Sequence, residues 1–212
     1  MELEVNRQNK VVQVQAYNDD AMQVLDGMDL KGVDITVAVN AVIGSMVRNG
    51  YLGENNNTVL LSFSGTDNET LRQMLISDVD QTLQQQSISG AVFSQTISVS
   101  EETRQIAEQY SISTGKAEWI RTLTAENPSW TTDALANCSI TDLALLSTGK
   151  QNQSVPVDVN QGTVNDRQYI GTEKAQQIAL EQVPGAQVTG IEMDLERGQM
   201  IYDCLLYTSR CV

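Results

Sequence analysis

The sequence predicts an α+β fold: a small β-sheet with packed helices, then a helical segment, then a C-terminal unit made of a helix and a hairpin. Stretches that alternate apolar and polar residues occur within residues 1–99 and again after residue 186. This period of two is typical of half-buried strands. Between residues 100 and 147 the apolar residues recur at helical spacing instead. Residues 1–99 are expected to run β-β-α-α-β-α-β.

The N-terminal residues predict a β-hairpin. Residues 2–6 alternate, with Leu3 and Val5 on one face, and the polar residues 7–9 suit a turn. Residues 10–16 continue the alternation as a second strand. The first strand would then have only one neighbour within this stretch.

Cap-forming side chains mark where the helices begin. Asn18, Asp19 and Asp20 supply cap-forming side chains for a short helix, and Asp34 opens a longer amphipathic helix that ends at Gly50. Ser100 is a suitable cap for the first helix of the helical segment, and Pro128 ends the second. The other elements before residue 148 are expected as strands at 58–64 and 90–99, and as helices at 68–86, 132–136 and 139–146.

Composition divides the chain into three parts. Residues 1–147 are expected to form one domain, residues 148–168 a linker, and residues 169–212 a C-terminal unit. The linker is rich in Gln, Asn, Asp and Val and shows no sustained period. In the C-terminal unit a helix ends at Pro184, and two alternating stretches around Arg197-Gly198 predict a hairpin.

Charge and composition argue against several classes of function. The chain has 13 Lys and Arg against 27 Asp and Glu, a net charge of −14, which disfavours binding to nucleic acid and to anionic membrane surfaces. It contains no histidine, so no catalytic or metal site can use imidazole. No stretch approaches the roughly 20 apolar residues that cross a bilayer, and the chain is expected to be soluble. We predict no enzyme activity and no catalytic, cofactor-binding or metal-binding residues.

Several motifs have a simpler structural interpretation. Two Ser-Thr-Gly-Lys sequences, at residues 113–116 and 147–150, resemble the end of a phosphate-binding loop but lack its first glycine, and are expected to be turns between helices. Glu192, Asp194 and Glu196 share one side of a strand. Calcium needs six or more converging oxygens, so a solvated strand face is favoured over a calcium site.

Seven short motifs occur in a characteristic order: Met1–Arg7, Lys10–Val12, Ala16–Ala21, Leu30–Gly32, Gly50–Leu52, Tyr110–Lys116 and Leu135–Leu146. Their order and spacing resemble the extracytoplasmic part of RsgI-type anti-sigma factors, over roughly residues 1–147. Another set is similar to a PepSY module, namely Ile170, Ala175–Leu180, Pro184-Gly185, Gly198 and Ile201-Tyr202. Gly171 replaces the usual capping serine of that module, and Cys204–Val212 departs from its pattern. The module is therefore expected to be incomplete, with its last strand interrupted.

The resemblance implies a role in signal transduction. Members of the family are single-pass membrane proteins whose cytosolic segment holds an alternative sigma factor and whose outer part senses a signal. They cleave themselves at an Asn-Pro bond just ahead of the stretch matched by Met1–Glu4, so this chain is expected to lack that bond, the membrane helix and the sigma-binding segment. We therefore expect a sensory domain on the extracytoplasmic face of a bacterial membrane.

The expected partner is the upstream, membrane-anchored half of the same protein. It would pair through an open strand edge formed by Glu2, Leu3, Glu4, Val5 and Asn6. Two alternatives remain. One is a secreted or cell-wall-associated carbohydrate-binding protein that stacks polysaccharide on Trp119, Trp130 and Tyr169, although aromatic residues so placed are more often core and rim. The other is a PepSY-type module that inhibits a peptidase.

Overall fold

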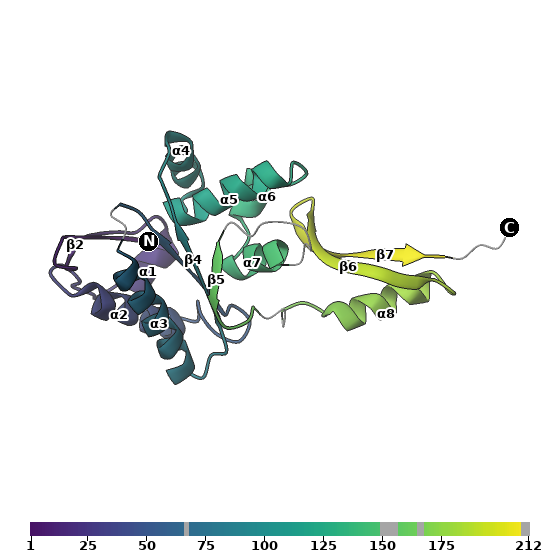
Figure 1. Cartoon of the computed structure of the whole chain (residues 1–212), viewed down its shortest axis with the longest axis horizontal. Helices are drawn as coiled ribbons and strands as arrows, with labels where there is room; N and C mark the ends of the chain where they lie inside the picture. Colours follow the sequence, from purple (N-terminus) through teal and green to yellow (C-terminus); the bar gives the residue numbers. More distant parts are fainter. Residues whose placement is uncertain (66–67, 149–156, 165–167, 209–212) are drawn as a thin grey trace.

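The computed structural model describes residues 1–65, 68–148, 157–164 and 168–208. The architecture is α+β, as the sequence predicts, and the expected order of elements in residues 1–99 is confirmed. In Figure 1 the elements of residues 1–148 gather at one end of the molecule, and the C-terminal unit extends away from them. Within the described residues the strands form one three-stranded and two two-stranded sheets.

Short strands and helices alternate along the chain. The strands are β1 (Glu2–Val5), β2 (Val11–Gln15), β3 (Thr58–Phe63), β4 (Ala91–Thr96), β5 (Asp158–Gln161), β6 (Gln187–Glu196) and β7 (Gln199–Tyr207). The helices are α1 (Asp19–Leu25), α2 (Ile35–Arg48), α3 (Glu69–Gln85), α4 (Glu101–Tyr110), α5 (Thr114–Glu126), α6 (Thr132–Ala136), α7 (Ile140–Thr148) and α8 (Thr172–Gln182).

The N-terminal hairpin is the antiparallel pair β1–β2, in which Leu3 lies opposite Val14. It packs on α1 and α2 through an apolar cluster that includes Val11. Of the three candidate caps of α1, Asn18 is the one that caps it, because its side chain accepts a hydrogen bond from the Ala21 N–H, while Asp19 and Asp20 lie in the first turn. Asp34, expected to open α2, is its N-cap and accepts a hydrogen bond from the Thr36 N–H. Each cap satisfies a backbone donor that the first turn of a helix leaves unpaired.

The central sheet has the strand order β3-β4-β5. β3 and β4 are parallel and are connected by α3, while β5 pairs with β4 in the antiparallel sense. β4 is the middle strand and is covered on both faces, because Ala91, Val92 and Phe93 are all fully buried. Residues of this kind form a continuous apolar run rather than an alternating one.

The stretch expected to be a linker, 148–168, contains β5, which the sequence did not predict. β5 reads Asp-Val-Asn-Gln and is too short and too polar to show a period. It forms a strand because the edge of β4 offers backbone partners, which is a tertiary effect that local patterns do not record. The other residues of this range fall partly at 149–156 and 165–167, outside the described residues. Of the second Ser-Thr-Gly-Lys sequence, Ser147 and Thr148 end α7, and the other two residues lie outside the described residues.

The helical segment comprises α4 to α7. Ser100 caps α4 as predicted, and Ser113 of the first Ser-Thr-Gly-Lys sequence caps α5, so this motif is a turn between two helices. Pro128 lies in the turn after α5, where the Asn127 side chain accepts hydrogen bonds from the Ser129 N–H and hydroxyl. Trp119 of α5 stacks on Phe93 of β4 with ring centroids 5.8 Å apart, which joins the helical segment to the central sheet.

The C-terminal unit consists of α8 packed on the antiparallel hairpin β6–β7. The expected interruption in its last strand is wrong as far as Tyr207, because β7 pairs with β6 through Cys204 and beyond. Gly171 occupies the N-cap of α8 and makes no side-chain cap bond. Met193 and Leu195, near the hairpin turn, are buried, whereas Leu205 and Tyr207 at the opposite end are exposed.

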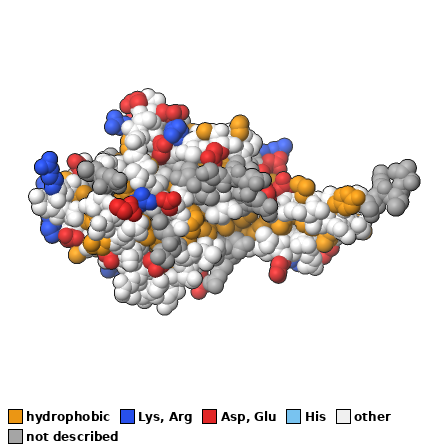
Figure 2. Space-filling model, in the orientation of Figure 1, with side chains coloured by type: hydrophobic (Ala, Val, Ile, Leu, Met, Phe, Trp, Pro, Cys, Tyr) orange, Lys and Arg blue, Asp and Glu red, His pale blue; other side chains and the backbone are white. Residues whose placement is uncertain are grey.

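The surface carries charge of both signs. Figure 2 shows acidic and basic side chains scattered over the face in view, with hydrophobic side chains also visible on the C-terminal unit. None of the described helices is long and apolar enough to cross a bilayer.

Candidate strand-pairing edge

The two outer edges of the N-terminal hairpin differ. On the β2 side, the Val11 N–H donates to the Val33 carbonyl at 2.9 Å and the Val11 carbonyl accepts from the Gly32 N–H at 2.7 Å. The Ile35 N–H also donates to the Asn9 carbonyl at 2.9 Å. On the β1 side, the backbone pairs only with β2 in the part of the chain that the structure describes. We call the outer edge of Glu2–Val5 the open edge.

The open edge is held in a defined position by the core beneath it. Val11 is 1% exposed and belongs to a cluster with Val24, Leu30 and Ile35. Leu3 packs against the same cluster from β1 itself. The strand therefore needs little further ordering before a partner pairs with it, which reduces the entropic cost of association.

Glu2 ties the open edge to the helical segment. Its carboxylate accepts hydrogen bonds from the Thr114 hydroxyl and from the Thr114 N–H, the latter at 3.1 Å, at the start of α5. A carboxylate is favourable there because the N-terminus of a helix carries unpaired N–H groups and partial positive charge. The Tyr17 hydroxyl also bonds to Glu2, and burial together with this bond raises the pKa of Tyr17.

The structure places four of the five predicted edge residues in β1, and the fifth, Asn6, outside it. The Asn6 side chain accepts hydrogen bonds from the Gln8 N–H at 2.9 Å and the Lys10 N–H at 3.0 Å, so it shapes the turn. Asn commonly bonds to the backbone just ahead in this way. Glu4 and Val5 are exposed, with Val5 at 36%.

Two of the three aromatic residues proposed as sugar-stacking platforms are buried. Trp119 is 0% and Trp130 is 3% exposed, so the carbohydrate hypothesis is wrong for these two residues. The Trp130 indole N–H donates to Asp194 Oδ1 at 2.7 Å. The Tyr169 hydroxyl donates to Asp142 Oδ1 at the same distance, and the ring is half-buried. Trp130 and Tyr169 thus connect the helical segment to the C-terminal unit.

The sequence favoured a solvated face for the three acidic residues of β6, but one of them, Asp194, makes a structural contact. Asp194 accepts the Trp130 hydrogen bond and lies between two buried residues of β6. Among the described residues, no three His, Cys, Asp or Glu side chains come together as a metal site.

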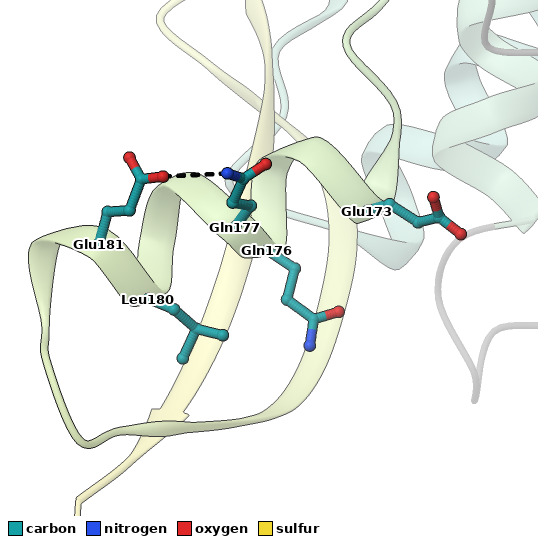
Figure 3. A pocket seen from close by; sticks show the side chains of 5 residues that line it. All are labelled: Glu173, Gln176, Gln177, Leu180 and Glu181. Carbon is teal, nitrogen blue, oxygen red and sulfur yellow. Dashed lines mark hydrogen bonds between the residues drawn. The ribbon is translucent and has the colours of Figure 1, made fainter.

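A shallow hollow of about 430 Å³ lies on the outer face of α8 and is lined by Glu173, Gln176, Gln177, Leu180 and Glu181. Figure 3 shows that all five side chains come from this one helix and that they do not converge on a common point. Gln177 donates to Glu181 at 3.1 Å, so this pair satisfies itself. Ligand sites combine enclosure with convergent polar groups, and this hollow has neither.

Two polar residues with structural roles, one fully buried and one partly buried, were not expected from the sequence. Asn57 is fully buried, and its amide donates to the carbonyls of Ser89 at 2.7 Å and Thr163 at 3.3 Å. The Lys116 ammonium donates to the carbonyls of Ala136 and Cys138 at the end of α6, and burial lowers its pKa. Neither has a sequence signal, since Asn57 lies in a polar loop and Lys116 in a motif that suggested only a turn.

Comparison with known proteins shows which family of α+β proteins this fold represents. Residues 1–122 match the anti-sigma factor RsgI-like central domain, and the chain belongs to this family. It is 25% identical over 170 residues to anti-sigma-I factor RsgI6 of Acetivibrio thermocellus, covering 75% of this chain and 22% of that protein. It is 27% identical over 150 residues to anti-sigma-I factor RsgI9 of the same organism, covering 68% of this chain and 21% of that protein.

The chain spans about a fifth of the length of these two relatives. Both relatives are named as anti-sigma-I factors.

Proposed function

We propose that the chain is the extracytoplasmic sensory part of a transmembrane anti-sigma factor, acting without catalysis. Its open edge would hold the membrane-anchored half of the same protein by strand pairing, and loss of that pairing would signal across the membrane to an alternative sigma factor. The observation that carries this proposal is the asymmetry of the hairpin. Residues 32–35 cover the outer edge of β2 at Val11, its first residue, whereas β1 pairs only with β2 among the described residues.

Strand addition suits a contact that must hold and then release. Each backbone hydrogen bond contributes only about 0.5–1.5 kcal/mol net. Four residues of edge therefore give a contact that is stable in a preorganised site yet can be reversed without breaking a covalent bond. The buried core under β1 keeps the acceptor edge formed while the partner is absent.

We also propose that residues 1–147 act as one domain and residues 169–212 as a PepSY-like unit. The observed order of helix and hairpin in α8-β6-β7 agrees with this division. The unit would act on the extracytoplasmic side together with the central domain.

The proposal is tested with a synthetic peptide that carries the residues encoded immediately ahead of Met1. At about 100 times its Kd the peptide is expected to stabilise the protein by about 2.7 kcal/mol. For a chain of this size that raises the Tm by about 5–10 °C. A scrambled peptide of the same composition is the first control.

Two N-methylated peptides make the test specific for backbone pairing. Successive residues of a strand direct their N–H groups to opposite edges. Methylation of alternate nitrogens therefore blocks one edge, and methylation of the other set blocks the other edge. Exactly one of the two peptides should lose the stabilising effect. If neither the parent nor either methylated peptide changes the Tm at saturation, strand pairing at β1 is excluded.

A further inference from the structure

Residues 157–164 lie across the edge of the central sheet, and we call this segment the strap. Its strand β5 pairs with β4, with Val159 opposite Phe93 and Asp158 opposite Ser94. Val157, ahead of β5, is 3% exposed and packs in the largest apolar cluster, and Val164 packs against the same cluster. The strap is thus an edge strand anchored by an apolar residue near each end.

Polar contacts fix the register of the strap. Asp158 forms an ion pair with the Arg72 guanidinium of α3 at 2.7 Å. Arg72 also donates to the Thr96 hydroxyl of β4 at 3.1 Å, so one guanidinium holds both strands. At the other end, a Cβ on Gly162 would lie 1.8 Å from the Gly90 carbonyl oxygen, and the Gly162 φ is +72°. Only glycine allows this close approach of two backbones.

The C-terminal unit docks on the same cluster. Leu195 of β6 is 7% exposed and is a member of the cluster that contains Val157, and Met200 of β7 packs against it. The Trp130 indole N–H donates to Asp194 at 2.7 Å, beside Leu195. The strap and the hairpin turn therefore belong to one apolar cluster, although their polar contacts are separate.

We propose that the strap and the docked C-terminal unit form one cooperative latch. Each attachment completes the cluster on which the other packs, so each stabilises the other. Undocking of the C-terminal unit then frees the strap, and the edge of β4 becomes available. The latch converts a movement of the C-terminal unit into a change of the central sheet. Because such coupling is reciprocal, loosening either attachment must loosen the other.

Hydrogen exchange of backbone amides, measured by mass spectrometry on the whole chain, tests this coupling. Asp194→Ala removes the acceptor of the Trp130 N–H, and Asp158→Ala removes the ion pair of the strap. Asp194→Ala is expected to accelerate exchange about tenfold in both the strap and β6, within the range of typical coupling energies. Asp158→Ala should accelerate it about threefold to fivefold in both, because the Asp158 side chain is 68% exposed and an exposed ion pair contributes less. Exchange in β2 and α2 should not change.

Matched controls separate the latch from general effects of charge. Glu192→Ala removes a carboxylate from β6 two residues before Asp194. Glu69→Ala removes the other carboxylate near Arg72, at 3.8 Å and outside the strap. Both controls should leave exchange in the strap and in β6 within about twofold of the parent. The latch is refuted if Asp194→Ala accelerates exchange in β6 alone, if Asp158→Ala accelerates it in the strap alone, or if exchange rises equally throughout the chain.

Discussion

The hairpins at the two ends of the described chain are both two-stranded, yet they are held in different ways. The N-terminal hairpin β1–β2 is short, and it is secured by a core residue, Val11, by backbone bonds to residues 32–35 and by the Glu2 contact to α5. The C-terminal hairpin β6–β7 is about twice as long. It buries side chains only near its turn, where Met193 and Leu195 lie.

The difference shows how docking decides what a hairpin can do. A two-stranded hairpin alone is marginally stable in water, so its order comes from the surface on which it packs. Contacts near both ends, through Val11 and through Glu2, make the N-terminal hairpin a fixed platform with one open edge. Contacts at one end would let the C-terminal hairpin detach as a unit from the cluster that contains Leu195. The proposed function uses the first property and the latch uses the second.

The largest expected effect comes from removing the buried leucine at the hairpin turn. Leu195→Ala should cost about 2–5 kcal/mol of docking free energy, because a buried leucine side chain is lost and a cavity remains. Hydrogen exchange should accelerate in β6, β7 and the strap but not in β1–β2. Val11→Ala should instead lower the stability of the N-terminal hairpin and its helices, by about 2 kcal/mol. If both variants accelerate exchange in the same segments, the two hairpins do not differ in the way described.

A smaller effect is expected at the contact that secures the N-terminal hairpin to α5. Glu2→Ala removes the acceptor of two hydrogen bonds at a helix N-terminus and should lower stability by about 1–2 kcal/mol, or the Tm by about 2–8 °C. Glu4→Ala, two residues along the same strand and exposed, should change stability by no more than about 0.5 kcal/mol. Equal shifts for the two variants would mean that the Glu2 contact adds nothing.

Sequence patterns predicted the parts of the fold that depend on neighbouring residues. The caps Asn18, Asp34 and Ser100 were found because a capping bond spans only two or three residues. The alternation of residues 2–6 predicted β1 because this pattern also involves only neighbouring residues. The sequence could not reveal that residues 32–35 cover the far edge of β2, since that contact joins segments about 20 residues apart.

The elements that were missed depend on distant partners. β5 is a strand because β4 lies beside it, and four polar or β-branched residues carry no period of their own. Trp130 and Asp194 were assigned to different roles, and only the fold brings them within 2.7 Å. Asn6 was assigned to the edge because turn and strand ends differ by a residue or two in any pattern.

The smallest expected effect is a loss of stability in mild alkali that originates under the C-terminal hairpin. Cys138 lies in the cluster that receives Leu195, and burial raises the pKa of its thiol to about 11. Above pH 9 the unfolded thiol loses its proton while the folded thiol keeps it, so the folded state binds more protons and stability falls as pH rises. The slope cannot exceed about 1.4 kcal/mol per pH unit for one group.

Between pH 9 and 10 several groups contribute, so the contribution of Cys138 is the difference between the parent and Cys138→Ala. Cys204, Tyr17, Tyr51 and Tyr169 also have raised pKa values and lower stability as pH rises. The partly buried Lys116 has a lowered pKa and acts in the opposite sense, adding stability as pH rises through its folded pKa. In urea unfolding at pH 8.5, 9.0, 9.5 and 10.0, the stability of the parent should therefore fall by up to about 1 kcal/mol more than that of Cys138→Ala. Parallel pH profiles for the two proteins would show that the thiol is not buried as described, and that the cluster under the C-terminal hairpin is open to water.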